Sequence, residues 1–250
     1  MSNGIYVGAS SHVALEKQLE TVSSNLANAD TTGFKKNRTI FSEYLHQYSK
    51  NEIPEKMRKS ATPQDKHFVE INEVTTDFSQ GGIQKTENPL DLAVSGDGFF
   101  TVREAGEELL QRSGRFTLDS EGVVVAEDGA ELLDENGNTI AVDPNFDINI
   151  TSDGAVLQNN AEIAKIDMKT VNDKGWLEKT HKTRYKIHEN ADVVPAEVNI
   201  MQGYLEKSNV NPIEEMVKMI KVHRHYDVAA KAVKSYEEMD SKANNAVGDV

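Results

Sequence analysis

The residues of this chain that could carry chemistry do not form a known catalytic pattern. Gly96-Asp97-Gly98 is followed by Phe99-Phe100, so the third glycine of a dinucleotide-binding loop is missing and no helix is indicated after it. Ser95 lacks the preceding glycine of a nucleophile elbow. The segment is therefore interpreted as a β-turn, and neither a nucleotide cofactor nor a serine nucleophile is expected.

Two groups of residues resemble metal ligands without completing a site. His223 and His225 are two positions apart on an expected helix, so their side chains point to different sides. Asp134, Asn136 and Asn138 are similar to the first ligands of a calcium loop, but the required glycine and glutamate do not follow. The chain has no cysteine, which excludes cysteine-based zinc sites. We expect no metal and no cofactor.

The charge distribution argues against nucleic acid as a partner. The 250 residues include 41 acidic and 27 basic side chains, giving a net charge of -14. Most of the acidic excess lies between residues 71 and 200, where attraction to phosphate is weak. Pairs of these carboxylates could in principle serve a glycosidase, but sequence spacing does not fix their separation in space. A solvated acidic surface is the preferred interpretation.

Both ends of the chain carry helical periodicity. Between residues 4 and 29, apolar positions recur at the spacing of a heptad seam, and turn-forming residues end the pattern near Gly33. Asn211-Pro212 supplies a cap and a first helical position for a second helix, with no further Pro or Gly before Gly248. The first stripe contains Leu15, Leu19, Val22 and Leu26, and the second contains Met216, Ile220, His223, Tyr226, Ala230 and Val233.

These stripes need cover, because each exposed apolar side chain forfeits about 1.5 to 3 kcal/mol of burial. The helices can pair with each other inside one molecule or with helices of other molecules. The sequence leaves both arrangements open.

The middle of the chain has the pattern of a β domain. From Asn88 onward, short alternating apolar runs are separated by turn residues such as Glu135-Asn136-Gly137-Asn138. We therefore predict an α+β fold whose long N- and C-terminal helices form a coiled-coil-like bundle, with a central antiparallel β domain between extended connectors. The expected segments are an assembly helix at 1–34, a connector at 35–87, the β domain at 88–176, a return connector at 177–210 and an assembly helix at 211–250.

Several segments resemble the bacterial flagellar rod and hook protein family. Residues 23–35, ending in Thr31-Thr32-Gly33-Phe34-Lys35, are similar to its S-N-N-L-A-N-x-x-T-T-G-F-K signature. Residues 88–100 resemble N-x-L-D-x-A-I-x-G-x-G-F-F, and Gly114-Arg115-Phe116 resembles the R-x-G-x-F segment after it. Residues 203–210 and 215–220 are similar to G-x-L-E-x-S-N-V and E-M-V-x-M-I. Residues 223–227 depart from the family's usual Q-R-x-Y-E.

The resemblance implies a non-enzymatic structural subunit of the basal-body rod, which polymerises with itself and other rod proteins into a helical axial assembly and transmits torque. It also implies export through the flagellar type III apparatus, without a cleavable signal peptide, without direct membrane insertion and without nucleic acid. The length and the start at Met1-Ser2-Asn3-Gly4-Ile5 are more similar to the proximal than to the distal rod. The expected assembly interface consists of Leu15, Leu19, Val22, Asn25, Leu26, Asn28, Thr32, Gly33, Phe34, Met216, Ile220, His223, Tyr226, Ala230 and Val233.

Two other classes of protein remain as alternatives. One is a non-flagellar periplasmic enzyme that acts on glycans through the abundant carboxylates. The other is a ligand-binding or adhesive β module carried on a helical stalk, which predicts a discrete oligomer of few copies.

Overall fold

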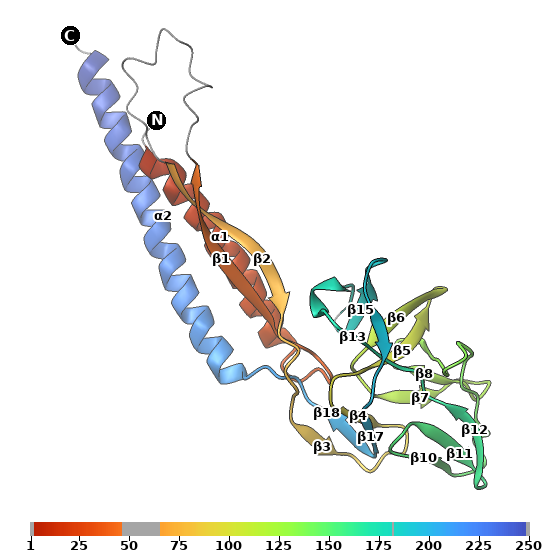
Figure 1. Cartoon of the computed structure of the whole chain (residues 1–250). Helices are drawn as coiled ribbons and strands as arrows, with labels where there is room; N and C mark the ends of the chain where they lie inside the picture. Colours follow the sequence, from red (N-terminus) through yellow and green to blue (C-terminus); the bar gives the residue numbers. More distant parts are fainter. Residues whose placement is uncertain (1–2, 47–65, 182, 249–250) are drawn as a thin grey trace. The chain divides into compact units, whose positions relative to one another are not determined.

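The computed structural model describes residues 3–46, 66–181 and 183–248 (Figure 1). Met1, Ser2 and residues 47–65 of the expected connector lie outside the described residues. The chain divides into two compact units. We call Met1–Leu26, Asn37–Thr76 and Pro212–Val250 the helical unit, and Ala27–Lys36 and Asp77–Asn211 the β-rich unit. Each unit is therefore built from segments that are far apart in the sequence.

The helical unit combines two α-helices with one β-hairpin. Helix α1 spans Asn3–Ala27 and α2 spans Pro212–Gly248. Strands β1 (Asn37–His46) and β2 (Lys66–Thr76) pair antiparallel with a bulge between Ile40 and Phe41. Helix α2 begins at its proline and carries acidic residues in its first turn, where they suit the positive end of the helix dipole.

Two contacts show that α1 and α2 run antiparallel. The ring centroids of His12 and Tyr226 are 3.9 Å apart. Near the other end of α1, the Asn25 amide donates a hydrogen bond to the Glu215 carboxylate over 3.3 Å. Because the residue numbers rise along α1 where they fall along α2, the helices lie in opposite directions.

The expected α+β fold with a coiled-coil-like bundle of long terminal helices is wrong. The described residues form two α-helices against eighteen strands, so the chain is mainly β. The first part of the predicted seam on α2 is not covered within the chain, because Met216 and Ile220 are 50% and 55% exposed while Val222 is only 6% exposed. A heptad stripe indicates that one side of a helix is buried, but it does not indicate which element buries it. Helix α1 shares its unit with a hairpin as well as with α2.

The β-rich unit contains sixteen short strands and one 3₁₀ turn among the described residues. Their bounds are β3 Ile83–Lys85, β4 Leu92–Ser95, β5 Phe99–Glu104, β6 Glu107–Gln111, β7 Phe116–Leu118, β8 Val124–Ala126, β9 Glu131–Leu132, β10 Ile148–Ile150, β11 Ala155–Gln158, β12 Ala161–Lys165, β13 Met168–Val171, η1 Lys174–Trp176, β14 Leu177–Lys179, β15 Arg184–Ile187, β16 Val193–Pro195, β17 Asn199–Gln202 and β18 Tyr204–Glu206.

The largest sheet of this unit has the order β14-β15-β6-β5-β9-β8-β7, with β13 pairing both β5 and β16 beside that path. A three-stranded sheet β10-β11-β12 and the pairs β17-β4 and β18-β3 complete the unit, and these pairings are antiparallel. Thus strands from the expected connectors, β3 on one side and β14 to β18 on the other, are part of the β-rich unit. These strands show no alternation of apolar and polar residues because each is only three or four residues long.

Consecutive residues of β5 pack into different clusters, as side chains alternate across a strand. Phe100 belongs to the main core and meets Phe116 edge-on with ring centroids 5.3 Å apart. Phe99 belongs to a smaller cluster with Leu110 and Tyr185. The large sheet therefore has apolar packing on both faces near β5. Among the described residues, no helix has the length and apolar character needed to cross a bilayer.

Candidate assembly site

Segments distant in the sequence meet at the carboxylate of Glu206, within the β-rich unit. This side chain is 2% exposed. Its Oε1 accepts hydrogen bonds from Lys35 Nζ at 2.6 Å and from the Gly81 amide at 2.8 Å. Its Oε2 accepts from Arg112 Nε at 2.6 Å. One buried carboxylate on β18 thus joins the end of the first signature segment to Gly81 and to Arg112, the residue that follows β6.

Two buried cations share this single carboxylate, and each also donates to main-chain carbonyls. Lys35 also donates to the Ser79 carbonyl over 2.8 Å. Arg112 donates to the carbonyls of Val94 and Gly98. Burial lowers the pKa of the Lys35 ammonium, and the charge of Glu206 opposes that shift. Such a cluster makes breaking any one partner costly, because a charge is then left buried without its counterion.

Two further features hold the chain around Glu206 in the β-rich unit. The Asn209 side chain accepts a hydrogen bond from the Lys36 amide at 2.8 Å and donates to the Asp77 carbonyl at 2.8 Å. Gly33 has a φ of +69°, and a Cβ there would lie 2.4 Å from the Ser113 amide nitrogen, so only glycine fits. Its amide donates to the Glu206 main-chain oxygen over 2.8 Å. We call Gly33, Lys35, Arg112, Glu206 and Asn209 the junction cluster.

A second polar contact ties the helical unit together. Asn25 and Asn37 exchange two hydrogen bonds of 2.8 and 2.9 Å, so the end of α1 is fixed to the start of β1. Asn25 also reaches Glu215 on α2, whose carboxylate is 3% exposed and lies 2.5 Å from Lys218 Nζ. A single asparagine therefore connects all three chain segments of this unit.

The outer side of α2 presents apolar side chains to solvent. Ile213, Val217 and Ile220 are exposed, whereas Val222 is buried. Nine residues correspond to about two and a half helical turns, so Ile213 and Val222 point to opposite sides of the helix. Helix α2 is consequently apolar on two faces, and the buried one also carries Glu215.

The structure distributes the expected interface residues over both units. Asn28, Thr32, Gly33 and Phe34 belong to the β-rich unit, and the remaining eleven belong to the helical unit. Val22, Asn25, Asn28, Gly33 and Phe34 are buried; Leu15, Leu19, Leu26, Thr32, Tyr226, Ala230 and Val233 are half-buried; and Met216, Ile220 and His223 are exposed.

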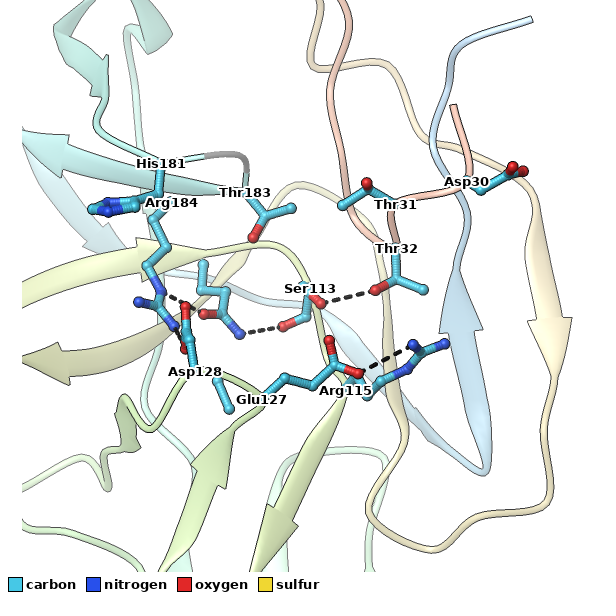
Figure 2. A pocket seen from close by; sticks show the side chains of 12 residues that line it. Asp30, Thr31, Thr32, Ser113, Arg115, Glu127, Asp128, His181, Thr183 and Arg184 are labelled. Carbon is cyan, nitrogen blue, oxygen red and sulfur yellow. Dashed lines mark hydrogen bonds and ion pairs between the residues drawn. The ribbon is translucent and has the colours of Figure 1, made fainter. Parts of the chain in front are cut away.

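A polar hollow of about 550 Å³ lies beside Thr31 and Thr32 in the β-rich unit (Figure 2). Thr32 and Ser113 share a hydroxyl hydrogen bond of 3.0 Å in its wall. Its guanidinium groups are already paired, since Arg115 lies 3.2 Å from Glu127 and Arg184 contacts Asp128. The lining side chains, shown in Figure 2, are almost all polar. This differs from the mostly apolar lining of small-molecule sites.

The residues considered for catalysis or metal binding take structural positions. Asp97 pairs with Lys174 at 2.8 Å, and this hydrogen bond lowers the pKa of the Asp97 carboxyl. Asp134 accepts hydrogen bonds from the amides of Asn136 and Asn138, which is the geometry of a turn. His223 is exposed, and its Nδ1 lies 3.4 Å from Oδ2 of Asp227. Within the described residues, no group of three or more His, Asp or Glu side chains is placed to hold a metal ion.

Three family models match the chain in order. Residues 5–35 match a model described as flagella basal body rod protein, and residues 93–158 match the D1 domain of the flagellar hook protein FlgE/F/G. Residues 201–246 match the C-terminal region of the flagellar basal body rod FlgEFG protein. The first and last of these matches contain Lys35 and Glu206, which meet in the junction cluster.

Similar proteins extend the match to the whole chain. The flagellar basal-body rod protein FlgF of Caulobacter vibrioides is 34% identical, with 100% of both chains covered. FlgF of Rhizobium meliloti is 31% identical, with 99% of both chains covered. The rod protein FlgG of Buchnera aphidicola subsp. Schizaphis graminum is 29% identical over 92% of this chain and 94% of its own. The chain belongs to the flagellar basal-body rod protein family, as its signature segments predicted.

Sequence reasoning missed most of the junction cluster. Lys35, Glu206 and Asn209 stand inside segments that carry the family resemblance, but nothing in their spacing shows that they meet. Arg112 gave no signal beyond its place near Gly114. The one available signal was the charge of Lys35, Arg112 and Glu206. Each of these side chains stands in or beside a stretch of strand or turn residues that the fold buries.

We predict that Glu206→Gln lowers the free energy of unfolding of the β-rich unit by about 3 to 5 kcal/mol, because Lys35 and Arg112 then stay buried without their counterion. Urea unfolding followed by the fluorescence of Trp176, the single tryptophan, measures this. The control is Glu87→Gln, which removes an exposed pair with Lys85 and should change stability by less than about 1 kcal/mol. Equal effects of the two substitutions would contradict the account.

Proposed function

We propose that this chain is a structural subunit of the proximal part of the flagellar basal-body rod. It polymerises with further copies and with other rod proteins, and it passes torque along the rod without catalysing a reaction. Part of the support comes from the relatives named above, which are basal-body rod proteins and which this chain matches over most or all of their length. The rest comes from one structural observation. That observation is the second, solvent-facing apolar side of α2.

The energetics of α2 favour a partner on this side. Ile213, Val217 and Ile220 each lose about 1.5 to 3 kcal/mol when they stay in water instead of being buried. A helix that packs on one side and meets only water on the other is expected to be polar there. The opposite pattern in α2 therefore suits a helix placed between its own chain and a neighbouring subunit.

The contacts of such a neighbour differ from those made inside the chain. The inner side of α2 uses Glu215 and Val222, and it is occupied by the chain itself. The outer side is a different surface, which remains open for a neighbouring subunit. We propose that the neighbour covers it with another of its own surfaces, which makes the contact head-to-tail. Contacts of this kind produce open helical assemblies when the rotation does not close a ring. This is the geometry that a rod requires.

We also propose that the chain leaves the cytoplasm through the flagellar type III apparatus without a cleaved signal peptide. Isolated helices are marginally stable in water, so terminal segments that gain their full cover only in the rod can pass a narrow channel unfolded. Blocking that apparatus should retain the full-length chain in the cytoplasm, as judged by immunoblotting of cell fractions. Its appearance outside the cytoplasm under the block, or a shortened N-terminus, would contradict this route.

Substitution of Ile220 tests the proposed assembly surface. Ile220→Gln should leave the purified monomer folded, with unchanged circular dichroism, because the side chain already faces solvent. Cells that carry it should swim poorly and yield basal bodies depleted of the chain, because a neighbour would have to bury an amide without a partner. Swimming in soft agar and immunoblots of purified basal bodies measure this.

Two matched substitutions separate assembly from folding. Lys221→Gln changes an exposed polar neighbour and should leave both swimming and stability near normal. Val222→Gln should destabilise the monomer itself, because it places the same amide on the buried side. Normal swimming and normal rod content with Ile220→Gln would overturn the proposed surface.

A further inference from the structure

A lysine outside every recognised segment contacts the first signature segment. Lys179, the last residue of β14, places its Nζ 4.0 Å from the centroid of the Phe34 ring. The same nitrogen donates a hydrogen bond of 2.9 Å to the main-chain oxygen of Lys35. One ammonium group therefore contacts both residues that follow Gly33. All of these residues belong to the β-rich unit.

The surroundings of this contact make it a defined site. Phe34 is 1% exposed, so its ring is enclosed and offers its face to the cation. A cation over an aromatic face within about 6 Å is attracted by the ring quadrupole, more strongly when water is excluded. Lys179 is half-buried, and its strand is held by the pairing of Lys179 with Tyr185 on β15. The ammonium is therefore positioned by a sheet and is not a free surface charge.

We propose that Lys179 is a positioning residue that fastens Phe34 and Lys35 to the edge of the large sheet, and thereby fixes the segment through which the chain passes from α1 to β1. The junction cluster holds this segment through Lys35 Nζ and the Lys36 amide. Lys179 holds it through the Phe34 ring and the Lys35 carbonyl, which the cluster leaves unused. The two sets of contacts are therefore complementary.

The titration behaviour of Lys179 agrees with this placement. Burial lowers the pKa of its ammonium to about 8. Titratable groups near it include Lys35, whose ammonium is paired with Glu206, and Tyr185, which is its partner residue on β15. The next pair of partner residues on the two strands is Glu178 on β14 and Lys186 on β15. Lys179 thus carries its charge at neutral pH and loses it as the pH rises through about 8.

Nuclear magnetic resonance of the full-length monomer tests the placement directly. The ε-methylene protons of Lys179 should be shifted upfield by the Phe34 ring current, and Phe34→Leu should abolish that shift. The same protons should titrate with a midpoint of about 8. A random-coil shift, together with a midpoint near the ordinary lysine value of about 10.4, would place the ammonium in solvent and overturn the proposal.

Variants in cells test whether this positioning matters. Lys179→Met keeps the apolar stem and removes the charge, and we expect loss of swimming. Lys179→Arg keeps a cation that can contact both the ring and the carbonyl, and we expect it to restore swimming. Lys186→Met is the matched control, because it removes an exposed lysine of the adjacent strand, and we expect normal swimming.

The two kinds of readout separate this inference from the proposed function. Only the swimming experiments rest on the proposed role in the rod, whereas the resonance shifts report the contact itself. Normal swimming with Lys179→Met would overturn the positioning role. If the shifts are as expected but the unaltered chain is absent from basal bodies, the proposed function fails and the contact stands.

Discussion

Helix α2 has apolar side chains on two opposite sides, and the described part of its own chain covers the side that carries Val222. The need to cover both sides of α2 explains how the helical unit is held together and why a rod subunit would bind a neighbour. The covered side holds α2 against the rest of the helical unit through Glu215 and Asn25. Burial of the uncovered side, with Ile213, Val217 and Ile220, would favour the binding of another subunit. The monomer therefore still exposes apolar surface on this helix.

The β-rich unit must hold together two separate segments of the chain, which enters and leaves the unit twice. Its strands are short, and many of them pair with strands far away in the sequence. The junction cluster adds directional contacts where apolar packing alone would allow sliding. Glu206 accepts from its three donors in the correct geometry only when Lys35, Gly81 and Arg112 are all in place around β18. Ionic side chains in such a position favour one arrangement over others, even where they add little net stability.

Local signals in the sequence predicted local features, and the family resemblance predicted the family. Pro212 marks the start of α2, and the Asn136-Gly137 segment forms a turn. Architecture was less accessible. The heptad spacing of Leu15 to Leu26 predicts half of a coiled coil, but spacing does not reveal whether a helix or a hairpin supplies the cover. The strands β14 to β18 were missed because each is too short to show alternation. Neither the junction cluster nor the contact of Lys179 with Phe34 has a signature in linear spacing, since both join residues more than 70 positions apart.

The chain contains no cysteine, so one introduced thiol reports on one position. The most direct measurement of the central claim is the rate of maleimide labelling of Ile220→Cys, in the purified monomer and in purified basal bodies, with Val222→Cys as the reference. The account predicts fast labelling at position 220 in the monomer and strong protection in the basal body, with position 222 protected in both. Equally fast labelling of position 220 in both forms would show that no subunit covers this side of α2, and would contradict the account.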